Sequence, residues 1–430
     1  QTEELARLEE QLTQSNLGEK VGKPPAFLAR RIIEMAADVD PETSRIILRD
    51  HHRKPWKQFV ALMQAKMPTP DSTAVRGRQY QHASEVLADL AILRKSLIEK
   101  GQSRAVAAHV YPVERSLQIF GFHLGKLDLR EDSRYYEKAM VQVLEASGIP
   151  DAADYSSWDT DRKLAFLSEQ LETRTTLGEM ASGKLELPAD ATEARNILAW
   201  MRVAKEYAES YGYDGLGPLI VSNTYNASDI LEVYFFAKEA GLTYVKSGEH
   251  HLEQLVVPLY EEGESAANSE ATSDRFLAEP IVQRSHDIFI AMLSYSDLTK
   301  DSAPLASWWY RDKVIRGQIR AAARAGKPLG LFHGRGGPFT RGGGPTNHLL
   351  NSLPPESIQG GAPVRTTEQG EVVIQNWSNP LTGLFNAEQW LAGAMFFAAA
   401  GERIPDHDED FVAIMDDLAD WSRDFYIEEL

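Results

Sequence analysis

The chain of 430 residues contains no cysteine, which excludes disulfides, thiolate chemistry and cysteine-bound zinc. It has no run of about 18 apolar residues, so a membrane-spanning helix is not expected. Positive charge is in deficit, since 45 Lys and Arg against 63 Asp and Glu give a net charge of −18. This balance argues against broad contact with nucleic acid or with an anionic membrane. The lack of cysteine favours the cytoplasm, and the acidic residues 1–14 are unlike a signal peptide.

Length and patterning predict a helix-rich α/β chain. The length permits one large domain or two to three smaller ones. Apolar residues that recur at intervals of three and four predict helices. The segments with this pattern are residues 84–100, 161–171, 194–210, 228–240, 305–324, 386–400 and 408–426. In the fourth of these, Ser228 is the expected N-cap.

Short apolar runs with turn residues predict buried strands. They lie at residues 217–223, 254–261, 287–297 and 327–333. Strands that alternate with helices indicate parallel strands joined by crossover helices. We therefore expect a mainly helical part over residues 1–215 and an α/β part over residues 216–430, within one continuous domain. Residues 365–371 are expected to form an exposed turn.

The most unusual segment is Gly330–Pro345, which holds seven glycines and two arginines in sixteen residues. Glycines such as Gly336 and Gly337 let the backbone approach a ligand, and successive N–H groups can bind an anion. Arg335 and Arg341 add forks of donors that fit phosphate or carboxylate. The loop has neither dinucleotide-binding nor Walker A spacing. A loop for a small, highly charged anion is the preferred interpretation over a solvated connection.

Charged side chains follow three of the predicted strands. Glu261, Asp297 and His333 come at or after the ends of separate apolar runs, and Arg335 follows His333. Ligand groups gather at the carboxyl ends of parallel strands. Two carboxylates without cysteine suit a hard cation, Mg²⁺ or Mn²⁺. The alternative is that each carboxylate caps a helix or forms an ordinary ion pair.

Other charged residues carry weaker signals. Lys300, three residues after Asp297, could lie beside a bound anion or be a solvated surface charge. Arg130 lies among acidic residues and by itself suggests an ion pair. The adjacent histidines at positions 51–52 and 250–251 do not face one ligand, so they do not predict metal sites.

Six segments, taken in order along the chain, resemble phosphoenolpyruvate carboxylases. They are LDLREDS (127–133), SDILEVYFFAKEAG (228–241), VPLYE (257–261), SYSDLTKD (294–301), FHGRGGPFTRGGGPTNHLL (332–350) and QGEVV (369–373). The resemblance implies part of an eight-stranded parallel (β/α)8 barrel with many additional helices. It also implies an Mg²⁺-dependent lyase that converts phosphoenolpyruvate and bicarbonate into oxaloacetate and phosphate.

The resemblance assigns roles to particular residues. Glu261 and Asp297 match the metal ligands, and Arg130 and Arg335 match the arginines that hold the substrate phosphate. The remaining matches are Lys300 beside bicarbonate, His333 beside the phosphate, and Arg341, which serves catalysis and inhibition by aspartate or malate. A homotetramer is also implied.

The chain departs from the family pattern in several places. The family's early catalytic histidine precedes a proline, and no His-Pro pair occurs here. The family's C-terminal part is also missing, and the family has a glycine near residues 302–303. We expect a fragment, one of two separate pieces, or a shortened inactive relative, in that order. The alternatives in function are a non-catalytic relative that binds a phosphorylated metabolite or a protein, and another phosphate-handling barrel enzyme. A cut barrel would expose apolar surface and unpaired strand edges.

Overall fold

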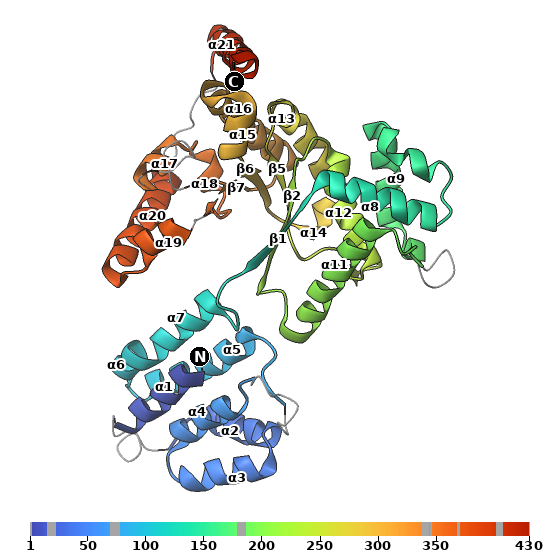
Figure 1. Cartoon of the computed structure of the whole chain (residues 1–430). Coiled ribbons are helices and arrows are strands. Elements are labelled where there is room, and N and C mark those ends of the chain that lie inside the picture. Colours follow the sequence, from blue (N-terminus) through green and yellow to red (C-terminus); the bar gives the residue numbers. More distant parts are fainter. Residues whose placement is uncertain are drawn as a thin grey trace. The chain divides into compact units, whose positions relative to one another are not determined.

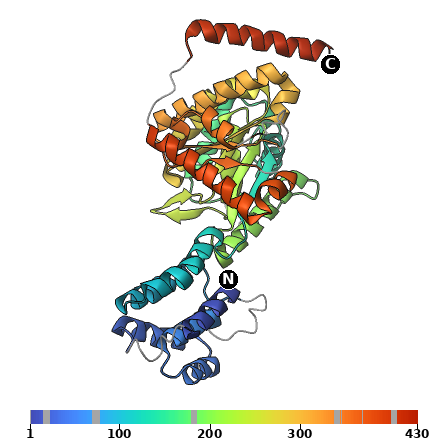
Figure 2. The same ribbon diagram turned by 90° about the vertical axis from the view of Figure 1, so that its left-hand side faces the viewer.

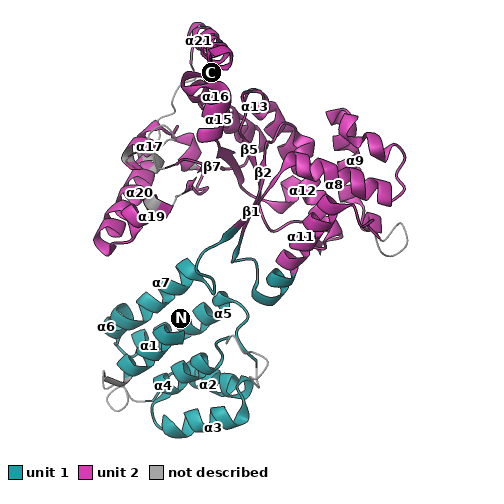
Figure 3. Ribbon diagram, viewed as in Figure 1, with its two compact units in different colours: residues 1–127, 206–216 teal, residues 128–205, 217–430 magenta. Residues whose placement is uncertain are grey.

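The computed structural model describes residues 2–14, 23–68, 78–178, 186–336, 344, 346–367, 370–400 and 407–429. The chain divides into two compact units (Figure 3). The N-terminal unit comprises residues 1–127 and 206–216, and the C-terminal unit comprises residues 128–205 and 217–430. The expected division into residues 1–215 and 216–430 stays a prediction.

The N-terminal unit is helical (Figure 1). Its elements are α1 (Thr2–Gln14), α2 (Ala26–Asp38), α3 (Pro41–Asp50), α4 (Pro55–Ala65), α5 (Ala83–Glu99), α6 (Ser103–Ala105), the π-helical turn η2 (Val106–Val110) and α7 (Tyr111–Phe120). Helix α4 lies at the centre, because six of its side chains are buried, including Trp56 and Phe59. The indole of Trp56 donates to Ser96 Oγ at 3.0 Å, which satisfies its buried N–H.

The C-terminal unit is built on a six-stranded sheet with the order β1-β2-β5-β6-β7-β8. Its strands are β1 (Leu127–Asp132), β2 (Leu216–Ser222), β5 (Val256–Tyr260), β6 (Phe289–Leu293), β7 (Leu329–His333) and β8 (Arg365–Thr366). Within this sheet the pairs β2–β5, β5–β6, β6–β7 and β7–β8 are parallel. The residues of β5, β6 and β7 are all buried, as expected for central strands of a sheet covered on both faces. A short antiparallel hairpin, β3 (Tyr244–Lys246) and β4 (Glu249–His251), lies apart from this sheet.

The sheet curls, so that its two edge strands are linked by side chains. Arg365 in β8 makes two hydrogen bonds to Asp128 in β1, at 2.8 and 2.9 Å, across 237 residues of sequence. Its guanidinium also lies over the Phe332 ring, 4.5 Å from the centroid. The prediction of an exposed turn at 365–371 is therefore wrong at its start, because residues 365–366 pair with β7 and are half-buried. The sheet of the described residues is a half-barrel of six strands.

Helices connect and cover these strands (Figure 2). They are α8 (Ser133–Ala146), the 3₁₀ turn η3 (Ala152–Ser157), α9 (Thr160–Glu172), α11 (Thr192–Tyr211), α12 (Ala227–Glu239), α13 (Gly263–Ala278), α14 (Pro280–Ser285), α15 (Ser296–Ser302) and α16 (Pro304–Ala325). Helix α12 begins one residue before Ser228, with Asn226 as its cap in a capping box with Asp229. Ser228 is instead a buried residue of the first turn.

The remaining helices are α17 (Thr346–Ser352), α18 (Glu356–Gln359), α19 (Gly370–Trp377), α20 (Pro380–Ala400) and α21 (Glu409–Glu429). Helix α21 packs on α16, where Asp416 accepts from Trp309 Nε1 at 2.6 Å and from Lys313 Nζ at 2.8 Å. Helices α19, α20 and α21 expose many large apolar side chains, including Leu381 and Trp421, which agrees with the expected exposed apolar surface. Among the described residues, no helix combines the length and the apolar character that crossing a membrane requires.

Candidate active site at the carboxyl ends of the strands

The first cluster of charged residues is centred on the carboxylate of Glu261, directly after β5. Glu261 is buried, with 6% of its surface exposed. Its Oε1 accepts from Arg130 Nη2 at 2.7 Å, and its Oε2 accepts from the backbone N–H of Asn223 at 3.1 Å. Asn223 follows β2 with φ of 53°, a conformation that asparagine tolerates, and its Nδ2 donates to Asp132 Oδ2 at 2.7 Å. These contacts join the ends of β1, β2 and β5.

The environment of Glu261 favours a nearby cation. Burial raises the pKa of Glu261, and the charge of Asp297 raises it further, although Arg130 and the Asn223 N–H oppose this shift. Two carboxylates at the ends of adjacent strands repel each other, and a cation between them removes that cost. The donor set therefore fits a hard divalent ion, because Mg²⁺ commonly uses one or two carboxylates together with water and substrate oxygens. No group of three or more His, Asp or Glu in the described residues is arranged as a metal cage.

Asp297 and Lys300 lie on α15, the short helix after β6. The Lys300 ammonium donates to Asp297 Oδ1 at 3.0 Å. The Lys300 side chain is 68% exposed and the Asp297 side chain is 54% exposed, so this ion pair is solvated and contributes little to stability. Both groups are accessible to a ligand.

The second cluster lies at the end of β7. His333 is its last residue and is fully buried, and Arg335 is 6% exposed. Gly334 lies between them, and its N–H donates to the carbonyl of Leu293 in β6 at 2.9 Å. A Cβ at Gly334 would lie 2.9 Å from that same carbonyl oxygen. The start of the glycine-rich loop is therefore pressed against β6, which explains the need for glycine here.

Tyr295 packs against His333, and Arg311 packs on Tyr295. The Tyr295 hydroxyl is 2.9 Å from His333 Nδ1, and the Arg311 guanidinium lies over the Tyr295 ring, 4.2 Å from its centroid. Burial lowers the pKa of His333 to about 3, and the charges of Arg335 and Arg311 contribute. His333 is therefore neutral near pH 7. Burial also lowers the pKa of Arg311, although Tyr295 opposes this.

Comparison with known proteins identifies the family. The sequence pattern described as "Phosphoenolpyruvate carboxylase" matches residues 3–430. The chain belongs to the phosphoenolpyruvate carboxylase family. Among relatives of that name, the protein of Aromatoleum aromaticum is 33% identical over 79% of this chain and 36% of its own length. The protein of Chromobacterium violaceum is 30% identical over 91% of this chain and 44% of its own length. The protein of Thermosynechococcus vestitus is 31% identical over 81% of this chain and 34% of its own length. The chain thus spans less than half the length of these curated relatives.

The structure brings together several of the residues that the phosphoenolpyruvate carboxylase resemblance selected. Arg130 contacts Glu261, Lys300 contacts Asp297, and the charge of Asp297 acts on Glu261. Gly336 follows Arg335 and is half-buried. Gly337 and Arg341 lie outside the described residues.

Sequence reasoning missed three residues beside these clusters. Asn223 ends a predicted strand run, and an amide at a strand end was an available signal. Tyr295 lies inside a segment that carried the family resemblance, but its hydroxyl partner is 38 positions away. Arg311 had no signal, because it lies on the predicted helix 305–324 among other arginines.

Three of the four histidines in the adjacent pairs contact other groups of the protein. His51 Nε2 is 3.3 Å from Glu9. His250 and His251 each use a ring nitrogen at a backbone carbonyl, at 3.2 and 3.1 Å respectively. None of these contacts joins a neighbouring pair at one ligand.

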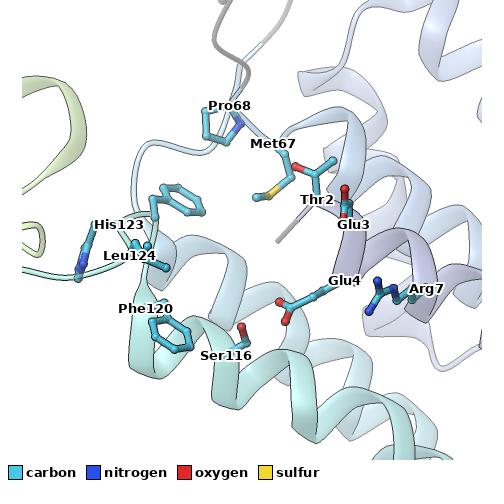
Figure 4. A pocket seen from close by; sticks show the side chains of 11 residues that line it. Thr2, Glu3, Glu4, Arg7, Met67, Pro68, Ser116, Phe120, His123 and Leu124 are labelled. Atoms are coloured by element: carbon cyan, nitrogen blue, oxygen red, sulfur yellow. The ribbon is translucent and has the colours of Figure 1, made fainter. Parts of the chain in front are cut away.

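A separate hollow of about 550 Å³ lies in the N-terminal unit (Figure 4). Its lining combines the apolar side chains of Met67 and Phe120 with Glu3, Glu4 and Arg7. The two carboxylates make it a poor site for the trianionic substrate that the resemblance implies. The candidate active site therefore remains at the strand ends of the C-terminal unit.

Proposed function

We propose that this chain carries the metal and phosphate sites of a phosphoenolpyruvate carboxylase. The observation that carries the proposal is the buried Glu261 carboxylate, set beside the charge of Asp297 and paired with Arg130. In a chain with a net charge of −18, an anionic substrate needs local cations. Arginine beside carboxylates meets that need, since the carboxylates hold a metal and the arginines bind phosphate.

The proposal gives each residue a task. Glu261 and Asp297 hold Mg²⁺ or Mn²⁺, which, when bound, supplies Lewis-acid stabilisation of negative charge on substrate oxygens. Arg130 and Arg335 bind the phosphate of phosphoenolpyruvate. Gly336 and Gly337 are assigned to the same phosphate, Lys300 to bicarbonate, and Arg341 to catalysis and effector binding.

The proposed reaction begins with attack of bicarbonate on phosphorus. This step forms carboxyphosphate and the enolate of pyruvate. Carboxyphosphate then breaks down to carbon dioxide and phosphate, and the enolate captures the carbon dioxide to give oxaloacetate. The residues position the two anions and stabilise the charge that develops on them. Arg130 must release Glu261 in part to reach a phosphate, and the exposure of nearly half its side chain, 48%, permits that movement.

Finer properties belong to the same proposal. We propose that further strands complete the six-stranded half-barrel to a (β/α)8 barrel, that the enzyme forms a homotetramer in the cytoplasm, and that aspartate or malate acts through Arg341. The exposed apolar faces of α19 to α21 support burial against further protein.

The test is a calorimetric titration of the purified protein with Mn²⁺ and with phosphoenolpyruvate, which measures the affinity for each. Arg335→Ala is expected to abolish detectable phosphoenolpyruvate binding, whereas Arg324→Ala, a change at an exposed arginine of α16, serves as the control and retains it. Asp297→Asn is expected to weaken Mn²⁺ binding more than metal-free substrate binding. Unchanged substrate affinity in Arg335→Ala would show that another loop binds the phosphate.

A further inference from the structure

His333 has one satisfied ring nitrogen and one orphaned ring nitrogen. Nδ1 contacts the Tyr295 hydroxyl at 2.9 Å. Nε2 is buried and has no hydrogen-bond partner among the described residues. Buried polar groups are nearly always paired, so such an atom next to Arg335 indicates a ligand atom as its partner. Which kind of ligand atom fits depends on whether Nε2 carries the proton.

Counting donors and acceptors decides the position of the proton. If Tyr295 donates to Nδ1, the proton of the neutral ring is on Nε2, and one buried N–H lacks an acceptor. If Nδ1–H donates to Tyr295 instead, the hydroxyl proton has no acceptor among the described residues and Nε2 has no donor. Each unsatisfied buried group costs about 1–3 kcal/mol. The first arrangement therefore has the lower energy.

Arg311 supports the same arrangement through the Tyr295 ring. Its guanidinium lies over that ring at 4.2 Å, and it forms no ion pair with a described carboxylate. A cation over the face of a phenol draws electron density from the ring, which makes the hydroxyl a better donor. Tyr295 is 8% exposed, so the stack also holds the ring in one orientation.

We propose that Tyr295 and Arg311 are positioning residues that hold His333 as a neutral Nε2–H donor directed at an oxygen of the bound anion. The inference rests on the proposed function for the identity of that anion, phosphoenolpyruvate. His333 then acts as a hydrogen-bond donor beside Arg335 and not as a proton-accepting base. The low pKa of His333, about 3, agrees with a ring that remains neutral. Neither Tyr295 nor Arg311 contacts the substrate in this role.

The primary measurement is ¹⁵N NMR of the purified protein labelled at histidine nitrogens, with His333 assigned by comparison with His333→Gln. In the wild-type protein we expect a proton-bearing Nε2 and an unprotonated Nδ1 near neutral pH. Addition of Mg²⁺ and phosphoenolpyruvate is expected to shift the Nε2 resonance, because the new acceptor is a charged oxygen.

The variants separate positioning from general stability. Tyr295→Phe is expected to populate the Nδ1–H form of His333 and to weaken phosphoenolpyruvate binding by about tenfold, the factor that corresponds to one hydrogen bond of about 1.4 kcal/mol. Arg311→Lys keeps the charge but loses the planar stack, so a smaller change in the same direction is expected. Tyr310→Phe is the matched control for Tyr295→Phe, because Tyr310 is the neighbour of Arg311 on α16 but its hydroxyl donates to Asp420. It is expected to leave both readouts unchanged.

Each outcome bears on a separate claim. A wild-type His333 protonated at Nδ1, or a Tyr295→Phe protein with an unchanged proton position, would overturn the positioning inference. If Tyr295→Phe does not fold, the wild-type spectrum and Arg311→Lys still decide. The expected proton position without any response to phosphoenolpyruvate would overturn the proposed function and leave the positioning of His333 standing.

Discussion

Gly334→Ala is the sharpest test of how β6 fixes the start of the glycine-rich loop. A methyl group at this position would lie 2.9 Å from the carbonyl oxygen of Leu293 and 3.1 Å from Met292 Cε, where ordinary contacts begin at 3.4 Å. The methionine side chain can move, but the carbonyl belongs to β6 and already accepts the Gly334 N–H at 2.9 Å. The loop must therefore shift by roughly 0.5 Å, because the strand cannot yield without loss of its pairing with β7.

The expected cost follows from this clash. Overpacking of a tight site typically costs about 1–3 kcal/mol, so we expect Gly334→Ala to lower the stability of the C-terminal unit by that amount. A shift of Arg335 by half an ångström is also expected to weaken phosphoenolpyruvate binding by about tenfold, since misplacement by 1 Å can cost about a hundredfold. Differential scanning calorimetry measures the first effect, because it can resolve separate transitions in a chain of two units.

Gly370→Ala is the matched control. A Cβ at Gly370 meets nothing within 4 Å, so the change is expected to alter stability by less than about 0.5 kcal/mol. If Gly334→Ala were as stable as Gly370→Ala and bound phosphoenolpyruvate normally, the argument for a loop pressed against β6 would fail.

Three further changes test other parts of the structure. Ala303 has φ of 67° and ψ of 162°, a region occupied almost only by glycine. Ala303→Gly is therefore expected to raise the free energy of unfolding by up to about 1 kcal/mol, whereas the control Ala306→Gly, inside α16, lowers it by about 1 kcal/mol. Equal effects of the two changes in calorimetry would refute this. Burial raises the pKa of Glu232 well above 4.5, so the folded protein binds the Glu232 proton more tightly than the unfolded chain does. The free energy of unfolding therefore falls as the pH rises through the window above 4.5. Urea unfolding of Glu232→Gln is therefore expected to show a growing advantage over the wild type in that window, and a constant difference would contradict it. Asp89 is 1% exposed and accepts two hydrogen bonds from Arg31. Asp89→Ala is therefore expected to lower the stability of the N-terminal unit by about 3 kcal/mol, as measured by thermal unfolding. A loss of stability below about 1 kcal/mol would be inconsistent with a buried ion pair.

Local sequence patterns carried much of the fold. The predicted helix 84–100 is α5 (Ala83–Glu99), and the predicted strand 327–333 contains β7 (Leu329–His333). Such elements follow from the spacing of apolar residues, which depends only on neighbours along the chain. The short strand β8 could not be predicted in this way. It has two residues, and it is a strand only because its backbone pairs with β7.

In the candidate site, too, the sequence predicted some features and only the folded structure showed others. Arg335, Glu261 and Asp297 were selected from residue type and position after strands, and their clustering follows from parallel strand ends. Their partners depended on folding, because Arg130 meets Glu261 across 131 residues of sequence. The residue type at position 130 permitted either an ordinary ion pair or a phosphate contact.

By itself, the sequence determined the helix-rich α/β class, the family and the residue types of an anion and metal site, because these depend on composition, periodicity and motif order. Only the tertiary structure decided which atoms meet. It placed Arg311 over Tyr295, set the Tyr295 hydroxyl against His333, and left Nε2 of that histidine without a partner among the described residues. The physical reason is that hydrogen bonds and buried charges act over a few ångströms in space, and their partners lie at sequence separations that only the packing of strands and helices brings together.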